Sequence, residues 1–131
     1  NQEIYGKYIE ILKDAGIVVS VFIAPDLDQV KAAYKVRADI IEIHTVKYAD
    51  AKDEAGHFRE IDNVLNAAKM AKKLNLQVSA GHGLTYHNVQ SLLKIREIEE
   101  YNIGHAIISQ AVLVGLSQAV RDMKIILNGS Y

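Results

Sequence analysis

The chain has 131 residues, half of them hydrophobic and about a quarter charged, which is the size and balance of one modest globular domain. Its net charge of −1 argues against nucleic-acid partners, and the lack of an apolar run of about 18 residues argues against a membrane span. Cysteine is absent, which excludes disulfides and thiolate metal sites and fits a reducing compartment, so we expect a cytoplasmic protein.

The spacing of the apolar residues switches repeatedly between the period of a helix and the period of a strand. Runs rich in β-branched residues predict four strands, at 17–24, 40–45, 77–80 and 105–109. Amphipathic stripes and their capping residues predict five helices, at about 4–15, 27–36, 58–74, 85–93 and 113–127. No low-complexity stretch or linker interrupts this order, so we expect one structural unit.

Strands that alternate with helices predict a parallel sheet with helical crossovers. Four such units form either an open, doubly wound sheet or half of an eightfold (β/α) barrel. In the strand at 40–45, Glu42 and His44 share one face. The other face carries Ile41 and Ile43. One aliphatic face and one polar face favour the half-barrel, because barrel interiors become polar near the carboxyl ends of the strands.

The sequence Gly81-His82-Gly83 follows the third predicted strand and is the sharpest candidate site. Glycine permits a positive φ and lets a ligand approach the backbone closely. Backbone N–H groups at such a turn suit a phosphate, and His82 would stand beside that anion with a side chain suited to proton transfer. The alternative is a tight strand-to-helix turn whose histidine is simply solvated, and the spacing alone does not choose between the two.

Gly104-His105, at the start of the fourth predicted strand, is a weaker candidate, because a glycine there often only relieves crowding. In eightfold barrels, however, the loops after the last two strands commonly share a phosphate site. Glu42 lies in an otherwise apolar strand, where a carboxylate is costly to bury without a partner. It either pairs with a neighbour such as His44 or holds a substrate amine or carbonyl. We favour the second role because two polar residues share its face.

The remaining histidines are interpreted as structural or solvated. We expect His44 to be a structural neighbour of the site and His57 to lie in a solvated loop. We expect His87, at the first turn of a helix, to lie either on the surface or behind the residues of the site. The charged run at 96–100 is also expected to be a solvated loop. The histidines and carboxylates lack the spacing of known metal ligands, so we predict no metal.

Three motifs stand out along the chain: IEIHT with YADA at 41–51, AGHGLTYHNV at 80–89, and NIGHAII at 102–108. Together they resemble the family of pyridoxine 5′-phosphate synthases, which belong to the deoxyxylulose-dependent route to vitamin B6. The ten-residue motif is the most specific, and the order and spacing of all three match. The resemblance covers this whole chain but only the C-terminal half of the family's protein. Residues 1–131 are therefore expected to be the C-terminal half of a single TIM-barrel domain.

The resemblance implies a fold, an activity and a site. The family is a (β/α)8 TIM barrel, of which this chain would supply the last four βα units preceded by one helix, and it usually assembles as an octamer. It condenses 3-amino-2-oxopropyl phosphate with 1-deoxy-D-xylulose 5-phosphate to give pyridoxine 5′-phosphate, phosphate and water, without a metal or organic cofactor. His82 is then the proton donor and Glu42 the transition-state stabiliser, while Gly83, Gly104 and His105 bind the aminooxopropyl phosphate.

The chain departs from the family pattern in two ways. Val46-Lys47 follows His44-Thr45 where the family usually has a glycine, which predicts altered contacts for that loop. The two bases and the arginine of the family's first half are absent, and the chain begins with Asn1 rather than Met. We therefore expect a processed start or an incomplete chain that is inactive alone. The alternative is a non-catalytic, phosphate-binding half-barrel that pairs with itself or with a partner.

Overall fold

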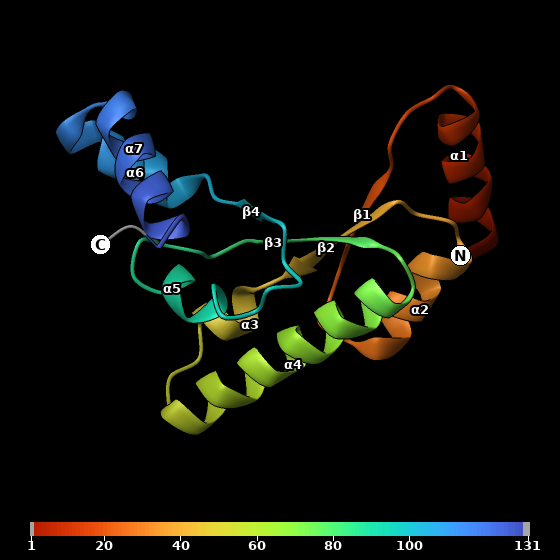
Figure 1. Cartoon of the computed structure of the whole chain (residues 1–131), viewed down its shortest axis with the longest axis horizontal. Coiled ribbons are helices and arrows are strands. Elements are labelled where there is room, and N and C mark those ends of the chain that lie inside the picture. The colour runs from red at the N-terminus through yellow and green to blue at the C-terminus, as the bar shows by residue number, and fades with distance from the viewer. Residues whose placement is uncertain (1, 130–131) are drawn as a thin grey trace.

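The computed structural model describes residues 2–129. In chain order its elements are α1 (Gln2–Asp14), β1 (Ser20–Ile23), α2 (Leu27–Lys35), β2 (Ile40–His44), α3 (Val46–Ala49), α4 (Glu54–Lys73), β3 (Gln77–Gly81), α5 (Val89–Leu92), β4 (Glu100–Asn102), α6 (His105–Val114) and α7 (Leu116–Leu127) (Figure 1). Within these residues, no helix is both long enough and apolar enough to cross a bilayer.

The four strands form one parallel sheet in the order β1-β2-β3-β4. The register places Phe22, Glu42, Ser79 and Glu100 in one row across the sheet, so the side chains of this row share a face. The predicted α/β fold with a parallel sheet and helical crossovers is confirmed. Sequence neighbours are also sheet neighbours throughout, which is the order that an eightfold barrel requires of its consecutive strands.

The core lies between one face of this sheet and the helices that cover it. Ile41 and Ile43 of β2 are completely buried on this face, as the alternation in the sequence predicted. Helix α4 packs against β2, β3 and α2 (Figure 1). Its buried side chains are mostly small, which lets the helix approach the sheet closely. They are Val64, Ala67, Ala68 and Ala71.

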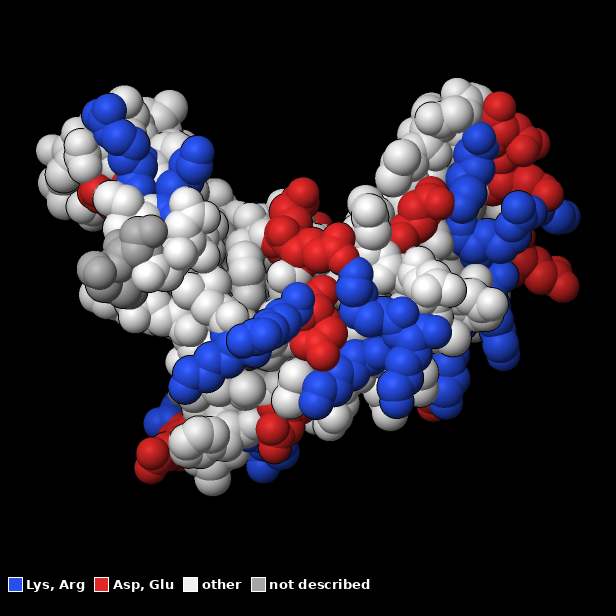
Figure 2. All heavy atoms as spheres, in the orientation of Figure 1, with Lys and Arg blue, Asp and Glu red and all other residues white. Residues whose placement is uncertain are grey.

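The other face of the sheet is uncovered. Phe22 exposes 54% of its surface there, while Glu42 and His44 are half-buried. Figure 1 shows α1 at one end of the sheet and the α6–α7 pair at the other, and Figure 2 shows the hollow between these two arms. Lys and Arg gather over the helices below the sheet in Figure 2, and Asp and Glu side chains lie at the floor of the hollow. The polar face predicted from the sequence is therefore the open one.

The prediction of the fourth strand was wrong. Residues 105–109 begin helix α6, whereas β4 is the short strand Glu100–Asn102 at the end of the charged run that we expected to be a loop. A short apolar run does not by its period distinguish a strand from a helix, and here the run continues helically to Val114. Gly104-His105 consequently follows the last strand instead of opening it. This moves the pair to the carboxyl ends of the strands.

Helix α6 is also separate from α7, where we expected a single last helix from about 113. Gly115 adopts a φ of +83° and divides the two helices. Helix α7 buries Ala119 and Met123 in the molecule. Helix α6 has no buried residue although most of its sequence is apolar, and Val112 and Leu113 expose 82% and 81% of their surface. The pair is thus attached to the core mainly through α7, and α6 adds the partly buried side chain of Ile107.

His57 lies in the first turn of α4, which corrects its expected place in a solvated loop. Asp53 caps this helix by accepting a hydrogen bond from the Gly56 N–H at 2.6 Å. The helix therefore begins before the first residue of the apolar stripe. The ring of His57 is half-buried and packs against the ring of Tyr48, with the two centroids 4.5 Å apart.

Candidate active site

A pocket of about 490 Å³ opens at the carboxyl ends of β2, β3 and β4. Asn102 of β4 and Ser109 of α6 contribute polar groups to its wall. The pocket also brings together every residue that the sequence analysis assigned to catalysis or phosphate binding. These are Glu42, His82, Gly83, Gly104 and His105.

The carboxylate of Glu42 lies over Gly81, the last residue of β3. A Cβ on Gly81 would lie 2.5 Å from Oε1 of Glu42 and 3.1 Å from the carbonyl oxygen of Asn102. Both distances are shorter than van der Waals contact, so glycine is the residue that leaves room for the carboxylate. We expected Gly81 to make the turn after the strand. It instead ends the strand, and the turn with positive φ begins at the next residue.

His82 holds the unusual backbone conformation of this turn. Its φ of +81° lies in the region that favours glycine, and a non-glycine residue there costs about 1–3 kcal/mol. The ring of His82 stacks on the ring of His44, with centroids 5.2 Å apart and an interplanar angle of 21°. Phe22 meets His44 edge-on at 4.9 Å. His44 is thus a neighbour of His82, and its interpretation as structural instead of catalytic stays a prediction.

Gly83 is confined both by its backbone and by its surroundings. Its φ is +75°, and a Cβ at this position would lie 2.8 Å from the Cβ of Ala49 in α3. A side chain at Gly83 would therefore meet α3 in addition to the torsional strain of a positive φ. The close approach of α3 explains why the turn needs a glycine immediately after His82.

Gly104 and His105 bring the N-terminus of α6 to the pocket. Gly104 is the N-cap residue and His105 is the first residue of the helix. No side chain caps α6, and no atom lies within 4 Å of the place where a Cβ of Gly104 would be. The first backbone N–H groups of α6 are therefore free of a side-chain cap at this wall. Such N–H groups, together with the helix dipole, favour an anion.

Tyr48 is buried and Tyr101 is half-buried, and both bond to the backbone of the segment that follows β3. The hydroxyl of Tyr48 donates to the carbonyl of Asn88, and the hydroxyl of Tyr101 donates to the carbonyl of Leu92 at 2.9 Å. Burial raises the pKa of Tyr48, and it raises the pKa of Tyr101 to about 12. Both hydroxyls therefore remain protonated hydrogen-bond donors at neutral pH, so we assign them to structure and not to proton transfer.

Thr45 and Asn88 make hydrogen bonds to the turn between β3 and α5, a role that was not predicted from the sequence. A weak signal was present, since threonine and asparagine side chains commonly bond to nearby backbone groups. For Thr45 the bonded backbone lies 36 and 37 residues away, and a sequence does not reveal that distance in space.

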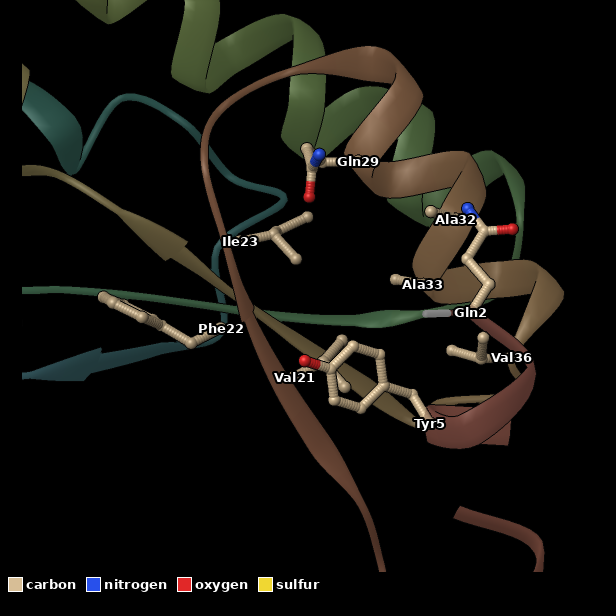
Figure 3. A pocket seen from close by; sticks show the side chains of 9 residues that line it. All are labelled: Gln2, Tyr5, Val21, Phe22, Ile23, Gln29, Ala32, Ala33 and Val36. Atoms are coloured by element: carbon tan, nitrogen blue, oxygen red, sulfur yellow. The ribbon is translucent and has the colours of Figure 1, made fainter. Parts of the chain in front are cut away.

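A second pocket, of about 500 Å³, lies between α1, β1 and α2. Figure 3 shows Tyr5 of α1 beside Val21 of β1, with Gln2 and Gln29 as the other polar side chains at the rim. This pocket contains no carboxylate and no imidazole, so it offers none of the groups gathered at the strand ends. In the described part of the chain, no three His, Asp or Glu side chains come together as a metal site.

The fold and the pocket define a class. This is a parallel α/β protein that collects a carboxylate, an imidazole and a helix N-terminus at the carboxyl ends of its strands, where such folds bind their ligands. The particular family follows from the sequence. Residues 1–129 match the family described as "Pyridoxal phosphate biosynthesis protein PdxJ". The chain belongs to this family, and the resemblance inferred from the three motifs is confirmed.

Curated relatives carry the name pyridoxine 5′-phosphate synthase. The protein of Syntrophotalea carbinolica is 54% identical over 124 residues, which cover 95% of this chain and 52% of the relative. The protein of Geotalea daltonii is 55% identical over 115 residues, which cover 88% of this chain and 48% of the relative. The chain thus spans about half the length of the curated relatives that it matches.

Proposed function

We propose that residues 1–131 supply the last four βα units, preceded by one helix, of a (β/α)8 TIM barrel that acts as a pyridoxine 5′-phosphate synthase. The observation that carries this proposal is the single pocket in which Glu42, His82, Gly83, Gly104 and His105 meet. The lengths support it as well, because the relatives are about twice as long and four parallel strands are half of those in an eightfold barrel.

The proposed substrate of this pocket is 3-amino-2-oxopropyl phosphate. Its phosphate lies against the backbone at Gly83, Gly104 and His105, which the uncapped N-terminus of α6 favours. The second substrate is 1-deoxy-D-xylulose 5-phosphate, and the products are pyridoxine 5′-phosphate, phosphate and water. The absence of a side chain at Gly104 has a use here, since it leaves the backbone at the start of α6 accessible to the anion.

Glu42 and His82 carry the proposed chemistry. The amine of the first substrate condenses with the ketone of the second, and positive charge develops on the resulting imine nitrogen. The carboxylate of Glu42, held over Gly81, stabilises that charge. His82 then gives a proton to a departing oxygen late in ring closure, so that water leaves in place of hydroxide. The exposure of the His82 ring at the pocket lets it reach the reacting atoms.

The remaining parts of the proposal concern the whole enzyme. The bases that remove protons in the earlier steps belong to the first half of the family's protein, so the chain alone is expected to be inactive. A cytoplasmic location and a homo-oligomer, an octamer in the family, belong to the same proposal. Its partners are then small phosphorylated substrates and further copies of the same chain.

A chimera tests this function directly. The part of the Syntrophotalea synthase that this chain does not cover is joined to residues 1–131, and pyridoxine 5′-phosphate is quantified by chromatography. The chimera is expected to form product, while residues 1–131 alone form none. His82→Asn in the chimera should lower turnover by about 10²–10⁴-fold, the usual contribution of a positioned acid. A His87→Asn variant, which alters an exposed histidine outside the pocket lining, is the matched control. Unchanged turnover in His82→Asn would refute the proposed proton donor.

A second candidate function is phosphate binding without catalysis, which the uncapped N-terminus of α6 favours on its own. This function needs Gly83, Gly104 and His105 but not Glu42. Calorimetry of residues 1–131 with a phosphate ester separates the two. Tight binding that survives Glu42→Gln, together with an inactive chimera, would support the binding module over the synthase.

A further inference from the structure

Thr45 stands where a helix cap is expected, but its hydroxyl is directed elsewhere. It is the N-cap residue of α3 and is completely buried, yet its side chain makes no capping hydrogen bond. Its Oγ1 lies 2.8 Å from the carbonyl oxygen of Gly81 and 2.6 Å from that of His82, and it donates to this pair. The backbone N–H of Thr45 donates to Gly81 as well, at 2.9 Å. The end of β2 thus holds the chain at the residue where φ becomes positive.

Asn88 holds the other end of the same turn. Its Oδ1 accepts a hydrogen bond from the Thr85 N–H at 2.7 Å, and its Nδ2 donates to the carbonyl of Gly83 at 3.0 Å. The hydroxyl of Tyr48 in turn donates to the carbonyl of Asn88. Side-chain donors on Thr45 and Asn88 therefore satisfy the carbonyls of three consecutive residues, 81–83. We call Thr45, Tyr48 and Asn88 the loop brace.

We propose that Thr45 and Asn88 are positioning residues that place the ring of His82 at the pocket. The ring is exposed, so burial in the core does not fix it. Its location depends on a backbone conformation that histidine does not favour, and such a conformation persists only where the surroundings impose it. The loop brace supplies that constraint, because releasing the turn would leave buried hydrogen-bonding groups without partners. This inference rests on the proposed role of His82 as proton donor.

The stacking of His82 on His44 provides a readout that does not depend on activity. In residues 1–131, nuclear Overhauser contacts between the two rings are recorded for the wild type and three variants. Thr45→Val removes the hydroxyl at nearly constant volume and should abolish these contacts. Thr45→Ser keeps the hydroxyl and should retain them. Ser79→Ala is the matched control, since it deletes a buried hydroxyl of β3 that bonds to Ile41 and not to the turn, and it should also retain them.

Thr45→Val with unchanged ring contacts would overturn the role of Thr45. If that variant does not fold, as judged by circular dichroism, Asn88→Ala tests the other end of the turn. Asn88→Ala should increase the hydrogen-exchange rate of the Thr85 amide, on the order of tenfold, and should weaken the contacts between the two rings. Asn88→Asp keeps the Oδ1 acceptor, so the Thr85 amide should still exchange slowly in that variant. Slow exchange and intact contacts in Asn88→Ala would overturn the proposal.

Titration with inorganic phosphate separates this inference from the proposed function. Wild-type binding that weakens on the order of tenfold in Thr45→Val and recovers in Thr45→Ser supports both. A wild type that shows no phosphate binding counts against the phosphate site, while the ring contacts still decide whether the loop brace positions His82. If phosphate affinity is equal in all variants and the ring contacts are unchanged, the proposed role of the loop brace is contradicted, while the phosphate site is not.

Discussion

The two ends of the sheet use their polar groups in opposite ways. At the amino ends of the strands, the carboxylate of Asp39 accepts hydrogen bonds from Lys13 at 2.5 Å and from the backbone N–H of Val19 at 2.9 Å. At the carboxyl ends, Glu42 and His82 line an open pocket. Polar groups at the first end satisfy one another, whereas those at the second face a space that a ligand can fill. The first end therefore serves stability, and the second is the end we assign to function.

The pocket itself contains a similar contrast. The turn after β3 is held closely, since Gly83 has a positive φ and no room for a Cβ. The turn after β4 is open, since Gly104 has a negative φ and free space around its missing side chain. Two glycines of the same site are thus required for different reasons. Gly83 allows the positive φ and the close approach of α3, and Gly104 leaves room beside the backbone.

The largest expected effect on stability comes from Gly83→Ala. The added methyl combines a positive φ with an approach of 2.8 Å to Ala49, and α3 would have to move. We expect a loss of about 3 kcal/mol in the free energy of unfolding, measured by urea denaturation. Gly6→Ala, in the open surroundings of a site on α1, is the matched control and should raise stability by about 0.5–1 kcal/mol. Equal changes in stability at Gly83 and Gly6 would contradict the claim that the turn after β3 has no room for a side chain at Gly83.

Gly81→Ala should have the next largest effect. The new Cβ would lie 2.5 Å from Oε1 of Glu42, a side-chain atom that can move, and 3.1 Å from the carbonyl oxygen of Asn102, which moves less easily. We expect a loss of about 2 kcal/mol by urea denaturation. The double variant Gly81→Ala with Glu42→Ala should recover part of that loss. If the double variant is as unstable as the sum of the single ones, the carboxylate does not occupy this space.

At the amino end, Asp39→Asn should show a smaller and pH-dependent effect. The hydrogen bond from Lys13, followed by that from the Val19 N–H, lowers the pKa of Asp39 in the folded state. A lowered folded pKa gives stability that is present above the unfolded value of about 3.9 and is lost as the pH falls through the folded value. The Lys13–Asp39 ion pair is partly exposed, so we expect Asp39→Asn to lower the free energy of unfolding by roughly 0.5–1 kcal/mol at pH 7. This difference should disappear at about pH 2. A loss that persists unchanged in acid would exclude this linkage.

Gly104→Ala is expected to have the smallest effect on stability. A methyl group meets no atom within 4 Å, and φ at this residue is already negative, so stability should change by less than about 0.5 kcal/mol. Affinity for a phosphate ester, measured by calorimetry, should nevertheless fall, because the methyl enters the space in front of the first turn of α6. Unchanged affinity would place the phosphate elsewhere in the pocket.

The sequence was sufficient to predict the parallel sheet and the polar face. The alternation of Glu42 and His44 with Ile41 and Ile43 depends only on the period of a strand, which is a local property. It was also sufficient to place Glu42, His82 and Gly83 together, because the carboxyl ends of parallel strands converge. Gly104 and His105 were named as candidates too, but they were placed at the start of a strand that proved to be a helix. The family resemblance added roles to these residues, and those roles remain predictions until they are tested.

The features that the sequence did not predict depend on non-local geometry. The run at 105–109 is apolar enough for either a strand or a helix, and only its place beyond β4 decides for the helix. Gly81 resembled a turn residue, although its lack of a side chain serves a carboxylate on the neighbouring strand. Thr45 precedes a helix as a cap would, but its hydroxyl bonds to a turn 36 residues further along the chain. None of these three features leaves a periodic pattern in the sequence.

Helix α6 has the composition of a protein core without any buried residue of its own. Ile108, Val112 and Leu113 together form an apolar surface of the kind that soluble monomers seldom expose. In a cell, such a surface is what holding chaperones and degradative proteases engage. The lifetime of this chain, and the concentration at which it can be purified without aggregating, should therefore depend on how soon α6 is covered.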